Sequence, residues 1–148
     1  MNPSLPRPAL AEALDLEPHP EGGWYRQTWA SPDVVHNAAG QPRAAGTLIL
    51  FLLPAGEASA WHRVASTEFW ITNGLGPVRL ELGGSGDAPV TDTTIDLGVD
   101  VAAGETPQLQ IAPGVWQRTV AADHDALVSC LVSPGFDFAD FELAAPQH

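Results

Sequence analysis

The stretch GEASAWHRVASTEFWITNG, residues 56–74, combines a glycine turn with two short strand-forming segments. Gly56 is followed by five residues and then His62, and Glu68 lies six residues further on. Aromatic and β-branched residues favour strands, so the stretch predicts strands over 60–64 and 67–72. His62 and Glu68 then lie on consecutive strands.

Short strands are expected along most of the chain. The segment TLILFLL at 47–53 is continuously apolar, which predicts a strand buried on both faces. Glycine, proline and aspartate clusters separate further strand-forming segments at 24–30, 78–82, 91–97, 108–112, 116–121 and 126–132. Residues 7–16 predict a short N-terminal helix, because their apolar side chains share one helical face, and 31–43 is expected to be a polar loop. This pattern indicates an all-β sandwich or closed barrel.

Composition limits the classes of function. With 148 residues, 45% of them hydrophobic, the chain suits one domain over 1–148. The net charge of −12 argues against nucleic acid and anionic membranes as partners. All six basic residues are arginine, so lysine nucleophiles are excluded. A single cysteine, Cys130, and the lack of a visible signal peptide or membrane span predict a cytoplasmic protein.

Five motifs occur together and in a fixed order along the chain. They are HPEGGWYRQTW at 19–29, AGTLILFLL at 45–53, GEASAWHRV at 56–64, APGVWQ at 112–117 and SPGFDFADFEL at 133–143. Together they resemble a family of small single-domain cupins long known only as a domain of unknown function. The resemblance implies a cupin-type double-stranded β-helix, which is a jelly-roll barrel, with a pocket inside the barrel and a dimeric assembly.

The resemblance also bears on metal binding. Many cupins hold a divalent metal through three histidines and a glutamate, and the matching positions here carry His62, Val64, Glu68 and Gln117. A further position where family members often have histidine carries Thr72. Two strong ligands accompanied by glutamine and threonine suit iron, zinc or nickel poorly. We therefore expect no cofactor, with a divalent metal on His62, Glu68 and Gln117 as the alternative.

His62 and Glu68 are instead expected to form a hydrogen-bonded acid–base pair. A neighbouring carboxylate raises the pKa of an imidazole and burial lowers it, so His62 would exchange protons near neutral pH with Glu68 orienting it. Tyr25, the only tyrosine, is a candidate for a second proton-transfer group. The prediction is a metal-independent isomerase, epimerase, dehydratase or cyclase acting on a small polar or sugar-like molecule. A non-catalytic protein that binds such a molecule is the alternative, and a metal-dependent oxygenase or lyase is a third.

Strand periodicity suggests which side chains contact the substrate. Alternate residues of a strand share a face, so Trp70 and Thr72 would point the same way as Glu68. Gln108 and Gln110 share another face, and Gln117 follows the APGVW motif. We expect these five side chains to bind substrate, with Trp70 as an aromatic wall.

Two expectations concern the chain ends and the assembly. His19 belongs to the HPEGG motif, where we expect a structural hydrogen bond. Open sheet edges are commonly covered by pairing, so a homodimer is expected, with the N-terminal segment exchanged between subunits.

Overall fold

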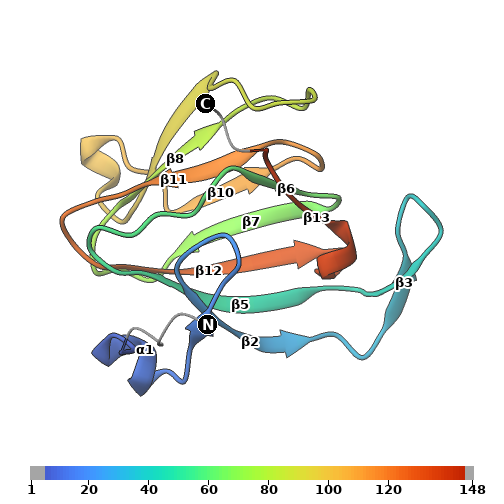
Figure 1. Ribbon diagram of the computed structural model, residues 1–148, viewed down its shortest axis with the longest axis horizontal. Helices are drawn as coiled ribbons and strands as arrows, with labels where there is room; N and C mark the ends of the chain where they lie inside the picture. Colours follow the sequence, from blue (N-terminus) through green and yellow to red (C-terminus); the bar gives the residue numbers. More distant parts are fainter. Residues whose placement is uncertain (1–5, 146–148) are drawn as a thin grey trace.

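A computed structural model describes residues 6–145, which form two facing sheets (Figure 1). The larger sheet has the order β1 (Glu17–Pro18), β2 (Trp24–Ala30), β5 (Thr47–Leu53), β12 (Ala126–Ser133), β7 (Thr67–Thr72) and β10 (Gln108–Ile111). The smaller sheet has the order β13 (Phe141–Leu143), β6 (His62–Val64), β11 (Gln117–Val120), β8 (Val78–Leu82) and β9 (Thr93–Leu97). The remaining elements are α1 (Ala9–Ala13), the hairpin β3 (Val34–His36) and β4 (Pro42–Ala44), and the 3₁₀ helices η1 (Val101–Ala103) and η2 (Phe138–Asp140). This arrangement confirms the predicted jelly-roll barrel with a short N-terminal helix.

Most predicted elements agree closely with the structure. The segments at 24–30, 47–53, 67–72 and 78–82 coincide with β2, β5, β7 and β8, and the other predicted strands differ by at most two residues at an end. The helix predicted over 7–16 is shorter, at Ala9–Ala13. The expectation of a polar loop at 31–43 is wrong in part, because β3 and β4 pair there around a turn. Asn37 closes that turn, since its side-chain Oδ1 and its backbone N–H both bond to Gln41. Residues 1–5 and 146–148 of the expected domain lie outside the described residues.

Strand β5 is covered on both faces over only half of its length. On the outer face, Leu52 packs in a cluster with Ala11 of α1, Leu16 and Trp24. Figure 1 shows α1 beside this end of β2 and β5. Towards the start of the strand, the outer leucines Leu48 and Leu50 are only half-buried. Burial on both faces was therefore a correct prediction only for the end that the helix covers.

The inner face of the larger sheet divides the barrel interior into two parts. Along β12, Ala126 and Val128 belong to the hydrophobic core, whereas Val132 lines a cavity and Cys130 touches both. Along β5, running antiparallel, Leu53 and Phe51 lie in the core and the inner side chains at the start of the strand line the cavity. One end of the barrel is therefore packed and the other end is hollow. None of the helices in the described residues is long and apolar enough to cross a membrane.

Candidate active site

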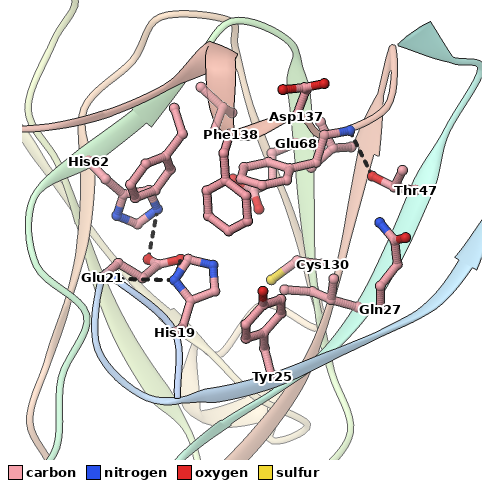
Figure 2. A pocket seen from close by; sticks show the side chains of 15 residues that line it. His19, Glu21, Tyr25, Gln27, Thr47, His62, Glu68, Cys130, Asp137 and Phe138 are labelled. Carbon is pink, nitrogen blue, oxygen red and sulfur yellow. Dashed lines mark hydrogen bonds and ion pairs between the residues drawn. The ribbon is translucent and has the colours of Figure 1, made fainter. Parts of the chain in front are cut away.

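The hollow end of the barrel contains a cavity of about 380 Å³ (Figure 2). Its side chains come from β2, β5, β6, β7 and β12, from the turn before β2 and from the segment that ends in β13. They are His19, Glu21, Tyr25, Gln27, Thr47, Ile49, His62, Val64, Glu68, Cys130, Val132, Phe136, Asp137, Phe138 and Phe141. We call His19, Glu21, His62 and Glu68 the polar cluster, and Phe136, Phe138 and Phe141 the phenylalanine cluster. The first cluster offers proton-transfer groups, and the second offers an apolar surface to a ligand.

His62, on β6, is an almost fully buried member of the polar cluster. Its Nδ1 lies 2.7 Å from the carbonyl oxygen of Ala60, and its Nε2 lies 2.9 Å from Oε2 of Glu21. Burial lowers the pKa of His62, but the charge and hydrogen bonding of Glu21, the charge of Glu68 and the Ala60 carbonyl together raise it to about 9. His62 is therefore an imidazolium at neutral pH, with both ring nitrogens facing protein acceptors.

Glu21 is placed against His62 by the glycine turn of the HPEGG motif. The backbone N–H of His19 donates to the carbonyl of Gly23, and Gly22 and Gly23 both have positive φ values, of 107° and 77°. A Cβ atom on Gly22 would lie 2.3 Å from the carbonyl oxygen of Ala58, so only glycine allows this close approach. The carbonyl of Glu21 also accepts from the N–H of Ala60, which ties the turn to the chain just before His62.

His19 holds the same turn from within the cavity wall. Its Nδ1 accepts a hydrogen bond of 3.1 Å from the backbone N–H of Glu21 and lies 3.3 Å from the carboxylate of that residue. Burial lowers the pKa of His19. The charge of Glu21 partly offsets this effect, and the charge of His62 adds to it. His19 is therefore neutral, with its proton on Nε2. The expected structural hydrogen bond is present, and the residue also lines the cavity.

Glu68, on β7, is the second buried carboxyl of the polar cluster. Gln117 Nε2 donates to its Oε1 over 2.8 Å, and Gln117 Oε1 accepts from Trp70 Nε1 over 2.8 Å. Burial raises the pKa of Glu68, the positive charge of His62 opposes this rise, and the negative charge of Glu21 adds to it. The pKa of Glu68 is about 7. Both the acid and the carboxylate form of Glu68 are therefore present at neutral pH.

Two further cavity side chains carry ionisable protons. Burial and the charge of Glu17 raise the pKa of Tyr25, so its hydroxyl stays protonated at neutral pH. Burial, followed by the charges of Glu68 and Glu21, raises the pKa of Cys130 well above its ordinary value. The Cys130 thiol is thus a buried, protonated group and a poor nucleophile.

The phenylalanine cluster lies on a segment that is anchored at several points. Phe141 stacks on the His62 ring with a centroid distance of 5.6 Å, and Phe136 and Phe138 meet edge to face at 4.9 Å. Arg43 on β4 makes a two-pronged ion pair with Asp140, with N···O distances of 2.8 and 2.9 Å. Because Phe138 lines the cavity and is 49% exposed, the cavity reaches the surface beside it.

Comparison with known proteins identifies the family. Residues 8–144 match the family described as Cupin superfamily (DUF985). The chain belongs to this family. A protein of Shewanella oneidensis of known structure is 35% identical, with a TM-score of 0.80, over 92% of this chain and 82% of that one. A hypothetical protein from Leishmania major is 32% identical, with a TM-score of 0.79, over 89% of this chain and 83% of that one.

More distant structures share the fold alone. The DMSP lyase DddQ from Ruegeria pomeroyi is 14% identical to this cupin, with a TM-score of 0.53, over 78% of this chain and 52% of that one. None of the curated proteins compared with this cupin matches it. The site itself must therefore supply the argument for function.

The structure separates the residues that the sequence singled out into two groups. His62, Glu68 and Tyr25, the predicted catalytic residues, all line the cavity. However, the ionic partner of His62 is Glu21, and the expected hydrogen bond between His62 and Glu68 is not among those of the described residues. Glu21 was missed because only tertiary folding brings the HPEGG turn to β6. The motif was visible in the sequence, but its glutamate was not singled out.

The predicted substrate-binding residues do not line the cavity. Gln108 and Gln110 are exposed, because the apolar alternation of β10 directs Ile111 into the core instead. Trp70 is a core residue that packs edge to face against Phe51. The other two predicted substrate-binding residues are also engaged by the protein. Thr72 accepts a hydrogen bond from the Gly74 N–H at the end of β7, and Gln117 is fully buried behind Glu68.

The residues of this cupin do not fit the metal site of many cupins. Val64 offers no ligand atom, and the amide of Gln117 is occupied by Glu68 and Trp70. Within residues 6–145, no three His, Cys, Asp or Glu side chains are arranged to hold a metal ion. The donor set thus argues against His62, Glu68 and Gln117 as joint ligands.

Proposed function

We propose that this cupin catalyses proton transfer on a small polar molecule, as an isomerase, epimerase, dehydratase or cyclase, with Glu68 as the acid–base group. The observation that carries the proposal is a buried carboxyl at the cavity whose pKa is about 7. General catalysis is most effective when the pKa of the group lies near the working pH, because both protonation states are then available.

The pair of His62 and Glu21 has a supporting role in this proposal. The two ring nitrogens of His62 face Ala60 and Glu21, so the imidazolium is held in place rather than free to exchange protons. Its positive charge favours the carboxylate of Glu68 and any negative charge that develops on the substrate. This differs from the expectation that His62 is the acid–base group and Glu68 its orienting partner.

Tyr25 is the second proton-transfer group of the proposal. Its hydroxyl faces the same cavity (Figure 2) and keeps its proton at neutral pH. A proton removed by Glu68 from one substrate atom would be matched by donation from Tyr25, or from Glu68 itself, to another. The net result is isomerisation or epimerisation, or loss of water when the second proton goes to a hydroxyl. No step requires a metal ion.

Hydrogen exchange in deuterated water tests the proposal before the substrate is known. A panel of small aldoses, ketoses and their amino derivatives is incubated with the protein, and ¹H NMR records which carbon-bound protons are replaced. We expect exchange at one position of at least one compound, rising with pH through about 7 as Glu68 ionises. Glu68→Gln should abolish this exchange, whereas Glu57→Gln, an exposed glutamate outside the cavity, should retain it.

The alternative of a non-catalytic binding protein gives a different result. Mass spectrometry of molecules carried through purification would then find a ligand that the protein leaves unchanged after long incubation. Exchange that persists in Glu68→Gln would contradict the assignment of Glu68.

A further inference from the structure

We infer that the cavity selects a small organic cation, such as an ammonium compound with a compact apolar body, over the corresponding neutral molecule and acid. This inference rests on the proposed function only in using the same cavity, and it names the chemical class of the ligand. The starting observation is that no arginine or lysine is among the fifteen cavity-lining residues, and the sequence contains no lysine. A carboxylate or phosphate would therefore find no basic side chain of the kind that binds such groups.

Three arginines near the cavity segments in sequence already have protein partners. Arg26, between Tyr25 and Gln27 on β2, donates from Nε to the carbonyl oxygen of Leu14. Arg43, on β4, is bound by Asp140 through two nitrogens. Arg63, next to His62 on β6, pairs with Glu142 at 2.9 Å. Among the described residues that line the cavity, His62 is the only cation, and its ring nitrogens face Ala60 and Glu21. A bound anion would have to compete with these contacts.

The fixed charges of the cavity favour a positive ligand. Glu21 and His62 compensate each other, and His19 is neutral, so the carboxylate form of Glu68 leaves one negative charge without a partner of opposite sign in the polar cluster. Asp137 adds a carboxylate to the lining, and the whole chain carries −12. Such a field raises the local concentration of cations and repels anions.

The phenylalanine cluster fits the rest of such a ligand. Phe136, Phe138 and Phe141 present ring faces and edges to the cavity, and Phe138 marks its opening. Aromatic rings bind a compact apolar body and also attract cations to their faces. The cavity volume of about 380 Å³ suits a molecule of single-ring size.

Matched probes test the inference by binding alone. Calorimetry at pH 8 compares benzylammonium, benzyl alcohol and benzoate, and then cyclohexylammonium, cyclohexanol and cyclohexanecarboxylate, on the full chain. Within each series the shape is nearly constant and the charge changes from positive to negative. We expect the ammonium member to bind at least about tenfold more tightly than the acid, with a preference that shrinks as salt is added.

Variants of the protein locate the preference. Glu68→Gln should reduce the ratio between ammonium and acid to near one, whereas Glu57→Gln, which removes the same charge from an exposed position outside the cavity, should leave it unchanged. Tighter binding of either acid, equal binding of the three members, no ammonium binding at the solubility limit, or an unchanged ratio in Glu68→Gln would overturn the inference. An ammonium probe that binds without any proton exchange on the sugar panel would contradict the proposed catalysis and leave the inference on ligand charge intact.

Discussion

Nε2 of His62 lies 2.9 Å from Oε2 of Glu21, although the two residues belong to separate motifs on different sides of strand β5 in the sequence. Both side chains are almost fully buried, at 2% and 7% exposure. This contact joins the HPEGG turn to β6 and sets the charge of the polar cluster. Because Glu21 is the ionic partner of His62, the buried carboxyl of Glu68 is the group that is left for proton transfer in the cavity.

Replacing Glu21 should therefore change the titration of His62. In Glu21→Gln the burial of His62 remains while the main charge that offsets it is gone, so we expect the pKa of His62 to fall from about 9 to near or below 6.5. NMR titration of the imidazole signals measures this, with His19 assigned separately. Glu57→Gln should leave the His62 titration unchanged, and a His62 that still titrates near 9 in Glu21→Gln would show that Glu21 is not its charge partner.

Replacing Glu68 should stabilise the protein at high pH. The raised pKa of Glu68 means that the folded state binds its proton more tightly, so stability falls as pH rises from 4.5 to about 7. Glu68→Gln keeps an acceptor for Gln117 and removes that loss. We expect a gain on the order of 2 kcal/mol at pH 8 and a smaller one at pH 5, measured by urea unfolding. A variant that is less stable than the parent at pH 8 would contradict the buried-acid description.

His62, like Glu68, should make the folded protein less stable as pH rises. Its folded-state pKa is raised, so its contribution is fully present below 6.5 and is lost as pH rises through about 9. The unfolding midpoint of Glu68→Gln should therefore still fall between pH 6.5 and 9. A midpoint that stays flat across this range in Glu68→Gln would argue that His62 is not an imidazolium in the folded protein.

Gln117 should prove to be a positioning residue. Gln117→Leu leaves the Trp70 N–H and the Glu68 carboxyl without their partner inside the barrel. We expect a loss of about 2–4 kcal/mol in unfolding free energy and a further rise in the pKa of Glu68. Gln110→Leu, at an exposed position of β10, is the matched control and should change stability by less than about 0.5 kcal/mol. Equal effects of the two variants would refute the role of Gln117.

The ion pair between Arg43 and Asp140 should hold the phenylalanine cluster over the cavity. Arg43→Met removes both contacts to Asp140, so amide exchange across 136–141 is expected to accelerate by about tenfold. Arg79→Met is the control, because Arg79 makes a similar pair with Asp96 on the exposed face of β8 and β9. Hydrogen exchange with mass spectrometry measures both. Unchanged exchange at 136–141 in Arg43→Met would mean that backbone contacts alone hold the segment.

Removal of metal ions should leave the function intact. Dialysis against a strong chelator, checked by elemental analysis, is expected to change neither the unfolding midpoint nor the proton exchange on the panel described above, because the donor set around Glu68 is committed to protein contacts. Loss of exchange that zinc, iron or nickel restores would contradict the metal-independent mechanism.

The barrel could be predicted from the sequence because its information is local. Apolar runs, β-branched alternation and glycine turns specify strands such as β5 and β7 wherever they later pair. The family motifs supplied the rest of the fold, since they occur in order from His19 to Leu143. Tyr25 and His62 belong to two of these motifs and Glu68 to the stretch 56–74, and all three line the cavity.

Only the tertiary structure decided how the polar residues pair and which of them face the cavity. A two-residue period says that Gln108 and Gln110 share a face, but not that this face is the solvent side; the burial of Ile111 in the core decides it. Likewise, no local pattern connects Glu21 with His62, because their contact depends on the turn that folds back onto β6. Charge pairing acts through space, so the chemistry of this cavity followed from the packing of distant segments rather than from any one motif.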